Sequence, residues 1–95
     1  MVKAVWNGKV LAESDDCKIV ERNFYFPPDS VNREYLKQSD TQTTCFWKGK
    51  ASYYDIEVDG KTLRDAAWYY PEPRRKARHI KDYVAFWKEV AVQDK

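Results

Sequence analysis

Two dipeptides, Asn7-Gly8 and Asp59-Gly60, constrain the fold of this chain more than any other feature of its sequence. Each stands between two runs rich in apolar residues: KAVW and KVLAES around the first, KASYYDIEV and KTLRDAAWYY around the second. Asn-Gly and Asp-Gly readily adopt the positive φ angles of two-residue hairpin turns. The sequence therefore predicts two antiparallel hairpins, the second closed by either a two- or a four-residue loop.

The register of the first hairpin follows from its turn. A two-residue loop sets Val5 opposite Val10 and Ala4 opposite Leu11. A further pair of short strands is expected in CKIVER and FYF, which are separated by Arg22-Asn23.

Prolines and a potential cap mark the end of this first strand region. Consecutive prolines in FPPDSV cannot donate to a strand ladder, so the strands should end there. Ser30 can then cap a helix of about two turns over VNREYLK, residues 31–37. The polar segment QSDTQT, residues 38–43, is expected to connect this helix to the central hairpin.

The C-terminal part begins where Pro71 and Pro73 end the central hairpin. Apolar spacing leaves helix and strand both open over residues 80–88. The β-branched and aromatic content of YVAFW favours a short helix near 74–81 followed by a strand. We therefore expect a mainly β fold: one small domain over residues 1–95, a curved antiparallel sheet or roll with two short helices.

Cysteine usage and the N-terminal sequence bear on location. The chain has two cysteines, Cys17 and Cys45, which form no CxxC pair, so two free thiols in a reducing compartment are expected, although a disulfide stays open. The first sixteen residues contain no apolar run long enough for a signal peptide or a membrane span. These features predict a cytoplasmic protein without membrane attachment.

Aromatic residues are the main candidates for a binding site. The chain has four Trp, seven Tyr and four Phe among 95 residues. Six of these rings fall on or beside the central hairpin: Trp47, Tyr53, Tyr54, Trp68, Tyr69 and Tyr70. Because side chains alternate along a strand, one face supplies core and the other can expose rings to stack on a flat ligand. We expect an aromatic pocket for a small planar or nucleotide-like ligand, lined by Trp47, Tyr54, Trp68 and Tyr70 with Cys45 and Lys48 at its rim.

Two catalytic alternatives stay open. Cys45 is a candidate nucleophile, since Lys48 follows closely and the only histidine, His79, could lower its pKa if the fold brings it near. The alternate acids Asp55 and Glu57 could act on a substrate, although a solvated strand face with Arg64 as cross-strand ion partner explains them as well. No acidic or histidine cluster completes a metal site, and KGKAS lacks the glycine spacing of a phosphate loop, so no metal and no cofactor are expected.

One basic segment stands out against a net charge of +2. RRKARHIK, residues 74–81, holds five Lys/Arg and no acid, which makes Arg74, Arg75 and Arg78 candidates for phosphate binding. The segment could instead be a solvated helix face or contact a protein partner. Low overall charge and the lack of a helix-turn-helix or RNP-like pattern argue against nucleic acid as the partner. The sequence does not decide the oligomeric state.

Four segments carry a resemblance to a known family: VWNGKVLAESDD, YFPPDSV, TTCFWKGKASYYDIEVDG and AAWYYPEP. Together they resemble the bacterial and fungal family called domain of unknown function 427, over residues 3–92. Phe46, where members often carry proline, and Arg22, where glycine is usual, depart from the pattern. The resemblance implies a small β-rich cytosolic domain. Domain collections label the family nucleotidyltransferase-like, which would direct attention to Asp55, Glu57 and Lys48.

Overall fold

The computed structural model describes residues 1–95 and contains nine strands and three short 3-10 turns. The strands are β1 (Val2–Trp6), β2 (Lys9–Ser14), β3 (Lys18–Val20), β4 (Asn23–Tyr25), β5 (Leu36–Cys45), β6 (Gly49–Val58), β7 (Lys61–Tyr69), β8 (Val84–Phe86) and β9 (Ala91–Asp94). The turns are η1 (Pro28–Ser30), η2 (Arg33–Tyr35) and η3 (Arg75–Ile80). The expected mainly β fold is therefore confirmed.

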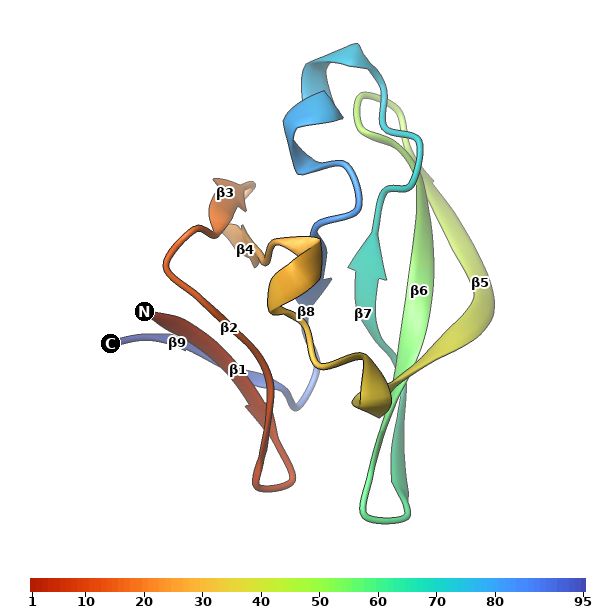
Figure 1. The fold of residues 1–95 in the computed structure, drawn as a ribbon. Helices are drawn as coiled ribbons and strands as arrows, with labels where there is room; N and C mark the ends of the chain where they lie inside the picture. The colour runs from red at the N-terminus through yellow and green to blue at the C-terminus, as the bar shows by residue number, and fades with distance from the viewer.

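The strands form three antiparallel sheets, ordered β2-β1-β9, β3-β4 and β5-β6-β7-β8. In Figure 1 the three-stranded sheet lies on one side of the molecule and the long strands β5, β6 and β7 lie on the other. The short strand β8 runs between them, and the β3-β4 hairpin lies above the three-stranded sheet. The sheets do not close into a barrel.

The first hairpin confirms the predicted turn and corrects part of its register. Val5 pairs with Val10 across the Asn7-Gly8 turn, as expected. A bulge then shifts the pairing, so Ala4 lies opposite Ala12 and not opposite Leu11. The other edge of β1 pairs with β9, a strand that the sequence did not indicate because AVQD is short and mostly exposed.

The central hairpin closes with the two-residue loop, since Val58 pairs with Lys61 around Asp59-Gly60. Strand β6 of this hairpin also pairs with β5. Residues 38–43 lie within β5, so the expectation that they only connect two elements is wrong. This strand lies at the edge of the sheet and pairs only with β6, so most of its side chains stay exposed. An exposed edge strand needs no apolar alternation, which is why its sequence reads as a loop.

The helix expected over residues 31–37 is wrong. Two separate 3-10 turns, η1 and η2, flank Val31, whose extended backbone bridges Ala12. The Ser30 hydroxyl donates to the Pro27 carbonyl at 2.7 Å and caps no helix. The short helix expected near residues 74–81 and the strand expected after it correspond to η3 and β8. No helix here has the length and apolar character needed to cross a membrane.

The β3-β4 hairpin is also present, with its turn one residue earlier than expected. Glu21 and Arg22 occupy the turn with φ angles of 52° and 70°, and Val20 pairs with Asn23. Neither turn residue is glycine, so this hairpin keeps two side chains in a conformation that L-residues rarely adopt.

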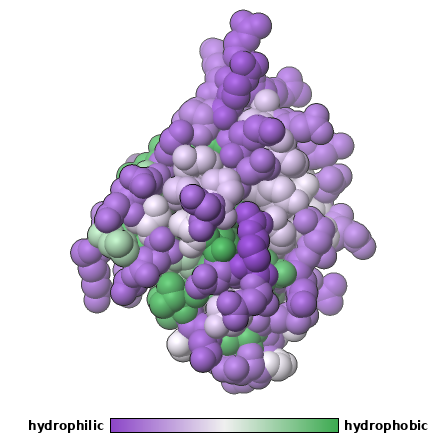
Figure 2. Space-filling view, in the orientation of Figure 1, coloured by the Kyte–Doolittle hydropathy of each residue, from purple (hydrophilic) through white to green (hydrophobic).

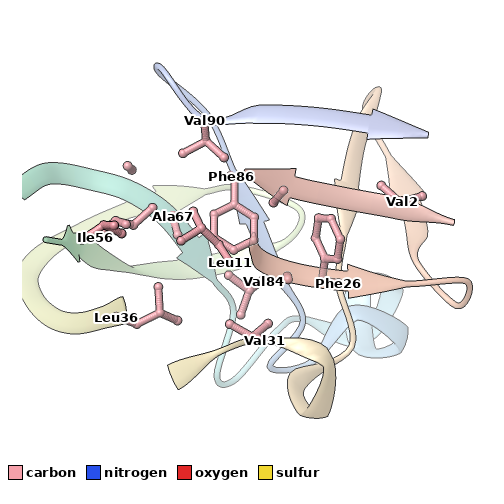
Figure 3. Packing of buried hydrophobic residues seen from close by; sticks show 14 residues of the cluster. Val2, Leu11, Phe26, Val31, Leu36, Ile56, Ala67, Val84, Phe86 and Val90 are labelled. Atoms are coloured by element: carbon pink, nitrogen blue, oxygen red, sulfur yellow. The ribbon is translucent and has the colours of Figure 1, made fainter. Parts of the chain in front are cut away.

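Two hydrophobic clusters lie on opposite faces of the four-stranded sheet. The larger one packs that sheet against the three-stranded sheet, and it contains Phe26 and Phe86 (Figure 3). The rings of these two residues meet edge to face with their centroids 5.6 Å apart. The smaller cluster lies on the other face and consists of Val20, Tyr25, Ala51, Tyr70, Ala77, Ile80 and Ala85. Strand alternation sends Ala67 and Tyr69 to the first cluster and Trp68 to the second.

Candidate functional site

A pocket of about 190 Å³ opens beside the smaller cluster, between the β3-β4 hairpin and the four-stranded sheet. Its walls come from strands β4, β6 and β7 and from three connecting segments. The lining residues are Asn23, Tyr25, Lys48, Tyr53, Trp68, Tyr70 and Trp87. Five of these seven side chains are aromatic, so the pocket combines flat apolar walls with a few polar groups, as ligand sites commonly do.

Hydrogen bonds hold the rings of this pocket in place. The Trp68 indole donates from Nε1 to the buried Tyr25 hydroxyl at 3.2 Å, with the two rings edge to face. Trp68 and Trp87 also meet edge to face, with centroids 5.9 Å apart. The Trp87 indole, 46% exposed, donates to the backbone oxygen of Asp65 at 2.6 Å. Both indoles are therefore fixed before any ligand enters.

Lys48 is the only buried charged residue in the protein, with 6% of the whole residue exposed. Its ammonium lies 5.2 Å from the Trp47 ring centroid and 5.8 Å from that of Tyr70, and it donates to the Glu21 carboxylate. Burial lowers the pKa of Lys48 below its ordinary value, while the Glu21 carboxylate acts in the opposite direction because it favours the charged amine. The result is a shielded cation at one end of an aromatic pocket.

A tight loop presents Lys48 to the pocket. Strands β5 and β6 pair Cys45 with Gly49, which leaves residues 46–48 as the connection. The Arg74 backbone N–H donates to the Lys48 carbonyl at 2.9 Å. Gly49 has a φ of 113°, and a Cβ there would lie 3.3 Å from the Glu72 carbonyl oxygen. The backbone of residues 72–74 therefore packs directly on this loop and fixes its position.

The structure brings most of the predicted ligand-binding residues to this region. Lys48, Trp68 and Tyr70 line the pocket. Trp47 lies beside Lys48 and donates to Glu21 at 3.3 Å. Cys45, half-buried, packs against the same cluster without lining the pocket.

Tyr54 alone among the predicted set lies on the opposite face of the sheet. Its ring stacks on Tyr69 with centroids 4.6 Å apart, and its hydroxyl accepts a hydrogen bond from Arg33 at 2.9 Å. Alternation along β6 places Tyr53 on the pocket face in its stead, directly across from Trp68. The position of Tyr53 could have been predicted from the sequence, because a two-residue loop at Asp59-Gly60 puts residues 53 and 68 on the same face of the hairpin.

The other pocket residues could not be found from local sequence patterns. Asn23 and Tyr25 come from the β3-β4 hairpin, and Trp87 follows β8. Their approach to the central hairpin depends on how three separate sheets pack. Glu21, the partner of Lys48, belongs to the same hairpin, and no motif in the sequence marks it as a site residue.

The catalytic candidates come from three different elements: Cys45 ends β5, Asp55 and Glu57 lie on β6, and His79 lies on η3. No hydrogen bond joins Cys45 to His79, which lies exposed on η3. Asp55 accepts the Asp65 backbone N–H at 2.8 Å, and Glu57 lies exposed opposite Thr62. The proposed ion partner of these acids, Arg64, takes part in none of the four ion pairs. A bulge between Tyr54 and Ile56 interrupts the β6-β7 pairing at Asp55. No group of three or more His, Cys, Asp or Glu side chains is placed to hold a metal ion.

The basic segment forms an exposed surface at one end of the molecule. Its five cationic side chains, Arg74, Arg75, Lys76, Arg78 and Lys81, are all exposed, and none takes part in an ion pair. The opposite side of η3 buries Ala77 and Ile80 against the smaller cluster. In the space-filling view this end of the molecule, at the top of Figure 2, is strongly hydrophilic.

Comparison with known proteins identifies one family. Residues 1–94 match a family model that is described as a domain of unknown function (DUF427) and whose name abbreviates NTP transferase. No curated protein matches the chain.

Proposed function

Because the chain belongs to the DUF427 family, whose description assigns no reaction, we propose a function from the site itself: binding of a small planar or nucleotide-like ligand in the aromatic pocket. The flat part of the ligand would lie against Trp68 and Trp87, and a polar edge would face Lys48 and Asn23.

One observation carries this proposal: the buried ammonium of Lys48 lines an otherwise aromatic pocket. Burying a charge is costly unless it is well paired, yet this ammonium has three N–H groups and makes one hydrogen bond within the protein. A ligand oxygen or ring nitrogen in the pocket would supply a further acceptor. The surrounding rings would contribute stacking and cation–π attraction.

The size of the pocket limits the ligand class. A cavity of about 150 Å³ in another protein accommodates benzene. The pocket here, at about 190 Å³, therefore suits one ring or a compact pair of fused rings. The remainder of a nucleotide, its sugar and phosphates, would extend outside.

The proposal is tested by ligand binding to the intact protein. We expect a panel of nicotinamide, benzamide, indole and adenine to contain a compound that quenches or shifts tryptophan fluorescence saturably, since Trp68 and Trp87 form pocket walls. Isothermal titration then gives the affinity.

Two matched variants separate pocket binding from surface adsorption. Trp87→Ala removes a half-exposed pocket wall, whereas Phe46→Ala removes a ring that is 85% exposed and lies outside the pocket. Binding should weaken about tenfold or more in the first variant, because stacking on one ring contributes about 1–3 kcal/mol. Equal affinities in both variants, or no binding of any panel compound to the wild type, would count against the proposal.

The exposed cations of residues 74–81 support a second function, contact with an anionic partner. Unpaired surface charges of one sign attract the opposite sign over roughly a Debye length, about 8 Å at physiological ionic strength. Reversing the charge of Arg74 and Arg75 to Glu should abolish capture of such partners. If every partner captured by the wild type is retained by the variant, this function is excluded for the segment.

A further inference from the structure

We propose that Trp47 and Lys48 form a carboxylate-binding site, that Glu21 occupies it as an internal ligand, and that an aromatic carboxylate bound in the pocket displaces Glu21. This inference rests on the proposed function and names its ligand class: a planar ring bearing an anionic carboxylate.

The geometry of the donors is the first step. Trp47 Nε1 donates to Glu21 Oε2 at 3.3 Å, and Lys48 Nζ donates to Glu21 Oε1. Neighbouring residues of one loop thus supply one donor to each oxygen of a single carboxylate. The Arg74–Lys48 backbone hydrogen bond pins the loop that carries both donors.

The second step is that Glu21 is held loosely. Its side chain is 50% exposed, while that of Lys48 is 8% exposed. It sits at the tip of a two-stranded hairpin with three residues in each strand, and both turn residues, Glu21 and Arg22, have positive φ. Tyr25 anchors the base of the hairpin in the core. Rotation of the Glu21 side chain into solvent would free the site without unfolding β3 or β4.

The third step links the anion site to the pocket. Lys48 lines the pocket and also holds Glu21, so one ammonium serves both. A ring carboxylate in the pocket restores the charge pair that the loss of Glu21 removes. A neutral ring gains nothing from displacing Glu21, since the cation would lose its counter-charge. The site therefore discriminates in favour of a carboxylate over the corresponding amide.

The test compares benzoate with benzamide by isothermal titration. Glu21→Gln removes the internal competitor's charge, and an internal ligand competes at the effective concentration that its tether sets. We expect the Kd for benzoate to fall about tenfold in this variant and the Kd for benzamide to stay unchanged. Lys48→Gln should abolish benzoate binding. Phenyl phosphate is the second anionic probe, and tighter binding of phenyl phosphate than of benzoate would assign the site to phosphate and overturn the carboxylate assignment.

A measurement independent of the pocket uses acetate, which carries the anion without a ring. The Trp47 indole N–H signal in nuclear magnetic resonance should shift saturably with acetate in Glu21→Gln and not in the double variant Glu21→Gln/Lys48→Gln. Glu21→Gly, whose turn position has a positive φ that suits glycine, provides a second variant if the first is poorly folded. Glu13→Gln, which removes an exposed pair with Lys3, is the matched control and should change neither result.

The outcomes separate this inference from the proposed function. If acetate binds but no ring compound does, the result supports the anion site and rejects the ring pocket of the proposed function. Ring binding with no gain for benzoate in Glu21→Gln, or no acetate response in either Glu21 variant, overturns the inference and leaves the pocket.

Discussion

The hydroxyl of Tyr25 accepts a hydrogen bond from the Trp68 indole, and the two rings stand perpendicular with centroids 6.1 Å apart. Tyr25 is fully buried in β4, and Trp68 lines the pocket from near the end of β7. This pair therefore ties the two-stranded hairpin to the four-stranded sheet. It also sets the orientation of the indole against which we propose that a ligand stacks.

Tyr25→Phe tests the energetic weight of this tie. The change removes one hydrogen-bond acceptor and leaves the ring packing intact, so we expect a loss of about 1 kcal/mol in the free energy of unfolding. Urea denaturation followed by fluorescence measures it. Tyr69→Phe is the control, because its hydroxyl donates to Gln38 at an exposed site and its loss should cost less. Equal losses in the two variants would contradict the structural role given to Tyr25.

Gly49→Ala should be the most disruptive glycine substitution. At a φ of 113° an added Cβ is strained, and it would also lie 3.3 Å from the Glu72 carbonyl oxygen. We expect a loss of about 2 kcal/mol in stability. Gly8→Ala serves as the matched control, since Gly8 also has a positive φ, 78°, but no atom within 4 Å of the new Cβ.

The control keeps a positive φ but lacks the crowding. Gly8→Ala should cost about 1 kcal/mol, the ordinary penalty for an L-residue in the left-handed region. Thermal unfolding of both variants gives the comparison. If Gly8→Ala is as destabilising as Gly49→Ala, the close packing of residues 72–74 on the Lys48 loop has no energetic weight.

Sequence patterns located the hairpins because their turns and apolar alternation act locally. Asn7-Gly8 and Asp59-Gly60 need no tertiary contact to favour their turns. Strands β5 and β9 were not predicted, because edge strands show little apolar alternation when their side chains face solvent. The bulge beside Ala4 was not predicted, because the register was derived from a regular two-residue alternation, which contains no inserted residue.

The site was predictable to the extent that one hairpin builds it. Trp68 and Tyr70 share a face by alternation, and Lys48 stands in the adjoining loop. The wall formed by Tyr25 and the counter-charge of Glu21 come from a hairpin more than twenty residues away in sequence. Only the packing of the separate sheets brings these residues to the pocket, and no local sequence pattern predicts that packing.

The carboxylate of Asp65 should make stability depend on pH in the acid range. Hydroxyl groups of Ser39 and Thr41 donate to it at 2.6 and 2.8 Å, and these bonds lower the pKa of Asp65 below its ordinary value. A lowered folded-state pKa contributes stability that is complete above the unfolded pKa, about 3.9, and lost as the pH falls through the folded value. The double variant Ser39→Ala/Thr41→Val should therefore lose less stability than the wild type between pH 5 and pH 2.

Urea midpoints measured across this pH range provide the check. Asp40→Asn is the control, because Asp40 is exposed on the same strand and its side chain makes no hydrogen bond. It should keep the wild-type pH profile. A double variant with an unchanged acid profile would show that the Ser39 and Thr41 hydroxyls do not stabilise the ionised carboxylate.

The thiol of Cys17 should react slowly at neutral pH. Burial, followed by the negative charges of Asp94 and Asp16, raises the pKa of Cys17 to about 11. The thiolate is the reactive form, so in a Cys45→Ser variant the alkylation rate with iodoacetamide should rise about tenfold per pH unit from pH 8 to pH 10. In urea the same thiol should titrate near its ordinary pKa of about 8.5, and its rate should level off above pH 9.

The same shift predicts alkaline destabilisation. Between the unfolded pKa and about 11 the folded state retains a proton that the unfolded state has lost, so the free energy of unfolding falls as the pH rises through this window. Cys17→Ser should remove that part of the pH dependence, because a serine hydroxyl does not ionise there. A folded-state alkylation rate that levels off near pH 9 would contradict both expectations, since it would mean that neither burial nor the neighbouring carboxylates disfavour the thiolate.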